Sequence, residues 1–181
     1  GMAIISSSTH PFAMWDEQQP TDKERYRSLE KDLAHVARRL LICGMHVHVG
    51  IEDEDLRIDL LGQLSYFLPH LLALSANSPF WIGLNTGLKS YRCKVFDKFP
   101  RTNIPDTFTS WADYESFVNL LVKTNSMDNA KKIWWDVRPH YKFPTLEFRI
   151  CDIPTRVDDT IAIAALFQAI VAKLMVLHEG N

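Results

Sequence analysis

Two segments that lie about a hundred residues apart constrain the fold of this chain more than any other feature, because each alternates apolar with chemically active side chains. They span residues 44–50 and 146–150. Successive side chains of a β-strand point to opposite faces, so each segment predicts a strand with one apolar face and one active face. The active faces carry two imidazoles, a carboxylate and a guanidinium, from His46, His48, Glu147 and Arg149.

If the two strands share a sheet, these side chains converge on one polar surface. Such a surface suits a metal ion and an anionic substrate. A third segment, residues 133–138, repeats the alternation with Trp134, Asp136 and Arg138 on one side. The sequence therefore predicts three strands that share the division between an apolar face and an active face.

Composition narrows the class of protein. With 181 residues, of which 46% are apolar, the chain is expected to fold as a single domain over residues 1–181 with a substantial core. A net charge of -2 and scattered basic residues argue against nucleic acid as a partner. The odd number of well-separated cysteines, Cys43, Cys93 and Cys151, predicts reduced thiols in a cytoplasmic protein.

The termini and the most apolar stretch give no sign of a membrane. Gly1 before Met2 is typical of a residue left by a removed purification tag, and the sequence from Met2 shows no signal peptide. The apolar stretch from Ile161 to Leu177 is shorter than the roughly 20 residues of a bilayer span, and it is interrupted by polar residues. We therefore expect a buried helix there and no membrane partner.

Hydrophobic periods and turn residues predict the elements along the chain. The predicted helices span about residues 22–40, 54–77, 111–122 and 155–177, and the predicted strands span residues 3–7, 44–50, 133–138 and 145–151. The last two strands are close enough to form a hairpin. Residues 82–109 are predicted to form a long loop with one helical turn around residues 90–95, and a loop of this length is usually functional.

Two helix details follow from single residues. Pro69 should kink the second helix, because proline lacks the N–H that an α-helix uses. Thr155 and Asp158 have the spacing of a capping arrangement at the start of the last helix. Helices on one face of an antiparallel-rich sheet, with the other face polar, describe an α+β fold.

The His46–His48 pair has two readings from the residues alone. Two histidines on one strand face can bind a metal, but equally they can be ordinary polar strand residues. Together with Glu52 they are similar to the first half of a cupin motif. A cupin continues with short strands, whereas this sequence predicts a long helix after Glu52, so a cupin-like metal oxygenase or isomerase requires the predicted helices to be strands.

Glu147 and Arg149 are also ambiguous when they are considered alone, because a charged pair on a strand most often faces solvent. Arg138 and His140, on the other side of the predicted hairpin, make a functional site the better interpretation. Two arginines and a carboxylate on one surface indicate that an anion and a cation lie between them, as phosphate oxygens and a divalent metal would.

Several longer strings then resemble one family, the bacterial carboxylate-amine ligases of the glutamate-cysteine ligase type 2 family. The strings occur in the family's order at residues 43–50, 74–81, 86–92, 135–140 and 146–152. Through that family the chain is more remotely similar to glutamine synthetase, whose catalytic sheet carries a Gly-Met-His-x-His strand and a Glu-x-Arg strand. The resemblance implies a glutamine synthetase-like catalytic fold.

The resemblance also implies an ATP-dependent ligase, in which ATP phosphorylates a carboxylate of glutamate and an amine such as cysteine displaces the phosphate. His46 and Glu147 would then hold Mg²⁺ or Mn²⁺. His48 and Arg92 would face the nucleotide phosphates. Arg138 and Arg149 would contact the transferred phosphoryl group or the activated carboxylate.

Family members of this type are much longer and begin with an acidic Glu-x-Glu strand, so the resemblance covers their middle portion and implies a truncated fold. A homo-oligomer or a partner chain is expected to complete the site. The rival interpretation is a non-catalytic remnant, which keeps the fold and serves as a nucleotide-binding or assembly protein.

Overall fold

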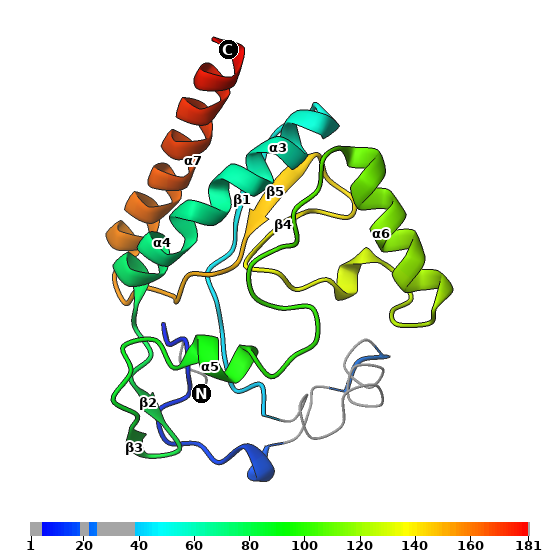
Figure 1. The fold of residues 1–181 in the computed structure, drawn as a ribbon. Coiled ribbons are helices and arrows are strands. Elements are labelled where there is room, and N and C mark those ends of the chain that lie inside the picture. Colours follow the sequence, from blue (N-terminus) through cyan, green and yellow to red (C-terminus); the bar gives the residue numbers. More distant parts are fainter. Residues whose placement is uncertain (1–4, 19–21, 25–38, 181) are drawn as a thin grey trace.

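A computed structural model describes residues 5–18, 22–24 and 39–180. Most of the helix predicted over residues 22–40, and the start of the strand predicted at residues 3–7, lie outside the described residues. The described part combines helices with antiparallel sheet, which confirms the predicted α+β class (Figure 1).

The main sheet has three antiparallel strands in the order β1-β5-β4. They are β1 (Val47–Gly50), β4 (Val137–Pro139) and β5 (Thr145–Phe148). β4 and β5 pair as the predicted hairpin, joined by the hairpin loop, residues 140–144. All three strands are shorter than predicted, but single backbone hydrogen bonds continue the pairing past their ends, from Met45 N to the carbonyl of Cys151 at 3.2 Å and from Arg149 N to the carbonyl of Asp136 at 2.7 Å.

The predicted second helix is present and broken where the proline requires it. Asp53 accepts a hydrogen bond from the Leu56 backbone N–H and caps α3 (Glu54–Leu64). A 3₁₀ turn, η2 (Ser65–Phe67), separates α3 from α4 (Leu68–Ser75), and Pro69 stands in the first turn of α4. The proline therefore interrupts the helix, as its missing N–H predicts.

Residues 76–110 hold more structure than the predicted loop. A two-stranded hairpin, β2 (Phe80–Trp81) and β3 (Leu84–Asn85), turns at two residues with positive φ, one of them Gly83 at 80°. Glycine suits such a tight turn because it has no Cβ. The predicted helical turn is α5 (Arg92–Phe96).

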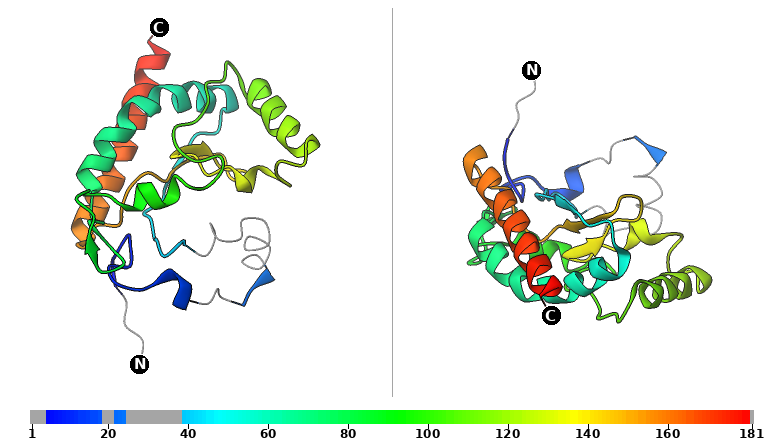
Figure 2. Two further views of the ribbon diagram at one scale, coloured as in Figure 1. Left: turned by 60° about the horizontal axis from the view of Figure 1, so that its bottom comes forward. Right: turned by 90° about the horizontal axis from the view of Figure 1, so that it is seen from above.

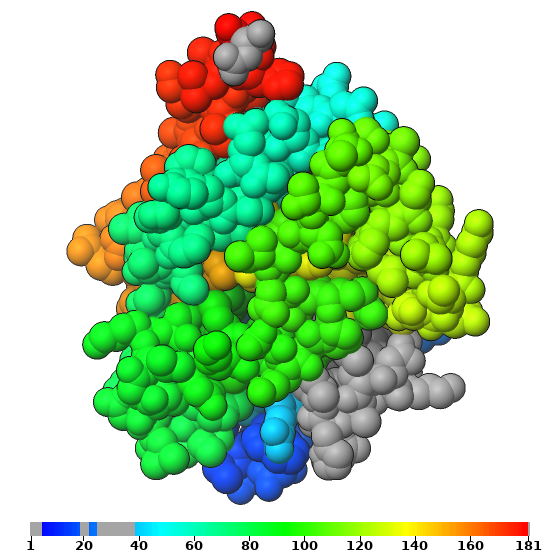
Figure 3. Space-filling model, viewed as in Figure 1, coloured from blue at the N-terminus to red at the C-terminus, as the bar shows by residue number. Residues whose placement is uncertain are grey.

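The remaining helices of the described residues are two long helices close to the predicted positions and two 3₁₀ turns that were not predicted. They are α6 (Trp111–Lys123), α7 (Val157–Glu179) and the 3₁₀ turns η1 (Trp15–Glu17) and η3 (Ala130–Lys132). α3 and α7 run side by side across the apolar face of the sheet (Figures 1 and 2). α6 lies against α3 on the side away from α7 (Figure 1). Seen from this side, the helices leave only strips of the sheet visible (Figure 3).

The core lies between the apolar face of the sheet and α3 and α7. Val137, Leu146 and Phe148 of the sheet are at most 1% exposed. Phe148 meets Phe167 of α7 with 4.2 Å between ring centroids. Burying one face of each strand against helices leaves the opposite face free for polar side chains.

The predicted start of the last helix is wrong. α7 begins at Val157, and its N-cap residue, Arg156, makes no side-chain capping bond. Thr155 instead accepts a hydrogen bond from the Asn77 side chain at 3.0 Å, so its hydroxyl holds the loop after α4 and does not cap α7.

α7 is also not the buried helix that the sequence predicted. One stripe, which includes Phe167 and Val171, packs into the core, while Ile161 on the outer side is 61% exposed. Within the described residues α7 alone is long and apolar enough to cross a membrane, and 22% of its most apolar window is buried. Length and composition of this kind also fit a core helix of a soluble protein, so they assign no location.

Candidate functional site

The predicted polar residues share one face of the three-stranded sheet, here called the charged face: His46, His48, Asp136, Arg138, Glu147 and Arg149. The register places His48 and Arg138 directly opposite Glu147 on either side. Residues that pair directly across antiparallel strands point to the same face. Continuing the same register gives a second row, in which Arg149 lies between His46 and Asp136.

Glu147 is the centre of the charged face. Its Oε2 accepts a hydrogen bond from Arg138 Nε at 2.8 Å, and its Oε1 accepts one from Arg149 Nη1 at 2.6 Å. His46 Nδ1 lies 3.2 Å from the same Oε1. The carboxylate is 3% exposed, so three side chains from three strands or strand ends meet at one buried acid.

The contacts around Glu147 determine the protonation states of the side chains on the charged face. Burial would raise the pKa of Glu147, but the hydrogen bond with His46 and the neighbouring Arg138 guanidinium hold the pKa well below its usual range. Burial, with the like charge of Arg138, lowers the pKa of Arg149 to about 10. Arg149 therefore stays cationic at neutral pH and Glu147 stays anionic.

The pKa of His46 is lowered at the same site. Its hydrogen bond with Glu147 favours the imidazolium, but burial and the charge of Arg149 outweigh that bond, and the pKa of His46 lies below its ordinary value. In the neutral tautomer that directs Nδ1–H at Glu147, the Nε2 atom of His46 carries the lone pair. That is the form in which histidine binds a metal.

His48 lies toward the hairpin loop. Its Nδ1 is 3.0 Å from Thr145 Oγ1, and its ring is 5.1 Å from that of His140. The side chain is exposed and is placed beside Glu147 by the strand register. Its predicted contact with nucleotide phosphates stays a prediction.

Arg92, from α5, lies behind the charged face. It is 4% exposed and donates to the backbone carbonyls of Arg149 at 3.0 Å and Ile150 at 3.1 Å. A Cβ on Gly44 would lie 2.2 Å from Arg92 Nη2, so the glycine makes room for the guanidinium. The structure thus gives Arg92 a bracing position under Arg149, and its predicted role toward phosphates stays a prediction.

Two acids near the site were not predicted as site residues. Asp136 shares the charged face, and burial raises its pKa to about 6 despite the charges of Arg92 and Arg149. The alternation of residues 133–138 places it on the active side of the predicted strand, but predicts no role for it in the site.

Asp152 is the second acid, and it is fully buried. It accepts hydrogen bonds from the Asn77 backbone at 2.8 Å and from the hydroxyls of Ser78 and Ser90 at 2.7 and 3.1 Å. Ser78 in turn accepts from the Arg92 backbone N–H at 3.1 Å. Asp152 therefore fixes the loop that carries Arg92, and no pattern in the sequence marks that role.

The residues fit a metal only in part. Among the described residues no group of three or more histidine, cysteine, aspartate or glutamate side chains is arranged to hold an ion. His46 and Glu147 offer one nitrogen and one carboxylate. Magnesium often binds through one or two carboxylates plus phosphates and water, so this pair fits an ion delivered with a nucleotide better than one bound by protein alone.

Comparison with known proteins settles the family. The family model described as glutamate-cysteine ligase family 2 matches residues 1–178. The chain belongs to glutamate-cysteine ligase family 2. The predicted resemblance to that family is confirmed.

Relatives from three bacteria carry the name "Putative glutamate--cysteine ligase 2". The protein of Solibacter usitatus is 63% identical over 180 residues, which are 99% of this chain and 47% of the relative. The proteins of Rhodospirillum rubrum and Sorangium cellulosum are 55% and 56% identical over 181 residues, which are 100% of this chain and 46% and 48% of the relatives. The chain thus spans about half the length of the curated relatives it matches.

Proposed function

We propose that this chain carries part of the catalytic site of an ATP-dependent carboxylate-amine ligase, which joins a carboxylate of glutamate to an amine such as cysteine through an acyl phosphate. The observation that carries the proposal is the meeting of Arg138, Arg149 and His46 at the buried Glu147 carboxylate. The membership of glutamate-cysteine ligase family 2 supports the same class of reaction.

The reaction has two steps. An oxygen of the glutamate carboxylate attacks the γ-phosphorus of ATP, and ADP leaves. The amine nitrogen then attacks the acyl carbon and loses a proton, and inorganic phosphate leaves with the former carboxylate oxygen. Both steps build negative charge on phosphoryl oxygens, and fixed cations stabilise such charge best where water is excluded.

The charged face supplies those cations. Arg138 and Arg149 are about 10% exposed and are held by Glu147, so their guanidinium groups are already oriented before a ligand arrives. Arg92 holds the backbone of Arg149 from below. In the proposal, Arg138 and Arg149 bind the transferred phosphoryl group and the activated carboxylate, and the exposed His48 contacts the nucleotide phosphates.

Magnesium or manganese would be held by Glu147 and His46 together with phosphate oxygens, and it would neutralise charge on the triphosphate. We further propose that the sheet belongs to a partial glutamine synthetase-like catalytic domain. A second copy or a partner chain would supply the remaining carboxylate ligands.

The test mixes the chain with Mg²⁺, ATP, glutamate and cysteine. The proposal predicts phosphate release that requires both amino acids, and a product with the mass of a glutamate–cysteine amide. Arg149→Gln should abolish both signals, while Lys123→Gln, an exposed change at the end of α6, should leave them unchanged. Phosphate release that is the same with and without glutamate would contradict the proposal.

One observation favours a second candidate, the non-catalytic remnant. Both oxygens of Glu147 already accept hydrogen bonds from arginines, which is how a purely structural ion cluster is satisfied. In that case Mg²⁺·ATP would raise the melting temperature of the protein without any phosphate release. Glutamate-dependent release would exclude the remnant.

A further inference from the structure

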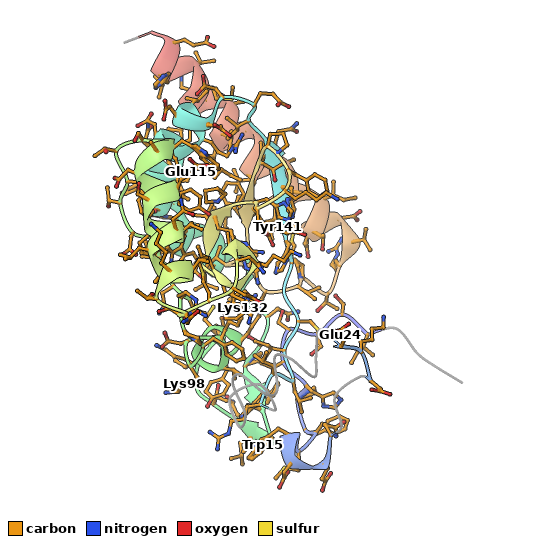
Figure 4. The ribbon with its side chains drawn as sticks, turned by 90° about the vertical axis from the view of Figure 1, so that its right-hand side faces the viewer. Trp15, Glu24, Lys98, Glu115, Lys132 and Tyr141 are labelled. Carbon is orange, nitrogen blue, oxygen red and sulfur yellow. The ribbon has the colours of Figure 1, made fainter. Side chains whose placement is uncertain are left out.

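A cavity of about 560 Å³, here called the α5 cavity, lies against α5, and its volume is within the range of small-molecule sites. Aromatic and basic side chains from four segments of the chain line it: Trp15, Arg39, Trp81, Tyr91, Lys94 and Lys98. Figure 4 shows Trp15 and Lys98 in the lower part of the molecule, away from Tyr141 of the hairpin loop. The described lining contains no acidic side chain.

The α5 cavity is separate from the charged face, because the two lie on different sides of α5. Lys94 and Lys98 follow Tyr91 at spacings of three and seven residues, which places all of them on one side of a helix. Arg92 extends from another side and donates to the backbone carbonyl of Arg149 at 3.0 Å. The α5 cavity is therefore not part of the site proposed for the ligase reaction.

Backbone hydrogen bonds hold the walls of the α5 cavity together. The Gly83 backbone N–H, at the turn between β2 and β3, donates to the Pro11 carbonyl at 2.8 Å. The His10 backbone N–H donates to the Leu41 carbonyl at 3.0 Å. These bonds join β2, the segment that leads to η1 and the segment around Arg39. The cavity is therefore formed before a ligand arrives, which lowers the free-energy cost of binding.

The cations of the α5 cavity have little anionic contact within the described part of the chain. Arg39 and Lys98 form no ion pair with a described residue, and the exposed Lys94 lies 4.0 Å from the exposed Asp97. An exposed pair at that distance is weak. The Arg39 guanidinium instead lies over the ring of Trp15, 4.8 Å from its centroid. Three like charges around one cavity repel one another, and an anion between them relieves that repulsion.

The aromatic side chains give the α5 cavity a flat apolar surface. Trp81 is 9% exposed and packs on the ring of Tyr91 with 5.9 Å between centroids. Trp15 adds a third ring from η1. Aromatic rings pack best on other rings, so this surface favours a planar ligand over a flexible chain.

We propose that the α5 cavity binds a small aromatic anion. The ring of the ligand lies against Trp15 and Trp81, and its carboxylate or phosphate is bound by Arg39, Lys94 and Lys98. Arginine and lysine both bind such groups through charge-assisted hydrogen bonds. The site is independent of the ligase reaction, because the ligand contacts none of the residues on the charged face.

Titration calorimetry with four probes tests the proposal. Naphthoate and naphthyl phosphate are aromatic anions, naphthamide has the ring without the charge, and cyclohexanecarboxylate has the charge without an aromatic ring. At least one aromatic anion should bind about 10-fold or more tightly than the last two probes, as expected for a charged hydrogen bond or a stacked ring. The tighter aromatic anion shows whether the site prefers a carboxylate or a phosphate.

The proposal is overturned if naphthamide or cyclohexanecarboxylate binds as tightly as the aromatic anions. It is also overturned if no probe binds at millimolar concentration.

Two exposed lysines locate the bound probe. Lys94→Gln combined with Lys98→Gln should weaken binding of the aromatic anion about 10-fold or more, because both changes remove a cation from the cavity. Lys142→Gln is the matched control, since it neutralises an exposed lysine of the hairpin loop beside a different cavity. It should leave the affinity unchanged. Unchanged affinity in the double variant, or an equal or larger loss in Lys142→Gln, would place the anion elsewhere and overturn the inference.

Discussion

At the scale of single residues, Glu147 determines how the charged face is built. A buried carboxylate between two guanidinium groups is stable only while both partners are present, because removal of the acid leaves two cations with little water around them. The acid also aligns Arg138 and Arg149 for binding an anion. The same residue is thus expected to control stability and ligand binding together.

Glu147→Gln should therefore lower the free energy of unfolding by about 3 to 5 kcal/mol, the usual cost of breaking a buried ion pair from one side. Urea unfolding followed by circular dichroism measures this change. Glu17→Gln, at an exposed position of η1, should change it by less than about 0.5 kcal/mol. A Glu147→Gln chain as stable as the unmodified one would show that the cluster is not formed in solution.

Asp136 gives a pH-dependent prediction. Burial raises its pKa from 3.8 to about 6, so the folded state binds a proton more tightly than the unfolded state does. Stability is therefore full below the unfolded pKa and is lost as pH rises through about 6. Asp136→Asn removes this loss, and the variant should be more stable than the unmodified chain at pH 7.5 by up to about 3 kcal/mol.

At pH 4 the difference should be much smaller, because the Asp136 carboxyl is protonated in the folded state and close to its ordinary pKa of 3.8 in the unfolded state. Urea titrations at the two pH values measure it. A variant that is less stable than the unmodified chain at pH 7.5 would mean that the Asp136 carboxylate is held by a favourable partner in solution.

At the scale of elements, alternation in the sequence was enough to predict which strand face is polar, and the register confirmed it for His48, Glu147 and Arg138. Strand ends were not predictable, because they depend on partners elsewhere in the chain. The predicted capping of α7 by Thr155 was wrong for the same reason, since Thr155 accepts a hydrogen bond from Asn77, a residue 78 positions away. The hydrogen bonds of Arg92 could not be predicted from the sequence, because their acceptors are backbone carbonyls and any residue has one.

Two glycine substitutions test whether Arg92 supports the backbone of Arg149 and Ile150. Gly44→Ala places a Cβ where the buried Arg92 guanidinium lies, and it should cost about 2 to 3 kcal/mol of stability as those charged hydrogen bonds are lost. Gly62→Ala, in α3 with open space around it, should stabilise the chain by about 0.5 to 1 kcal/mol. Equal effects of the two changes on the urea midpoint would contradict the supporting role of Arg92.

The orientation of α7 gives a second prediction at this scale. Phe167→Ala should destabilise the chain by about 3 to 5 kcal/mol, because Phe167 packs on Phe148 in the core. Ile161→Ala, on the outer side, should cost less than about 0.5 kcal/mol. A large cost at Ile161 would show that the outer side of α7 is covered in solution.

At the scale of the whole molecule, the described part ends its main sheet at β1, which pairs on one side with β5. An edge strand offers backbone groups to another strand, and several apolar residues of α7 are exposed as well. Both features agree with a site that is completed by another copy or a partner chain. Sedimentation velocity should show reversible self-association that increases with protein concentration, and a monomer at every concentration would contradict that expectation.

In the proposed reaction, a carboxylate is activated by phosphorylation on the charged face. The most direct test supplies glutamate labelled with ¹⁸O in its side-chain carboxylate, with Mg²⁺, ATP and cysteine, and follows the label by mass spectrometry of the released phosphate. An acyl phosphate transfers one carboxylate oxygen to phosphate, so the account predicts one ¹⁸O in each phosphate released during amide formation. Amide formation with unlabelled phosphate would contradict it.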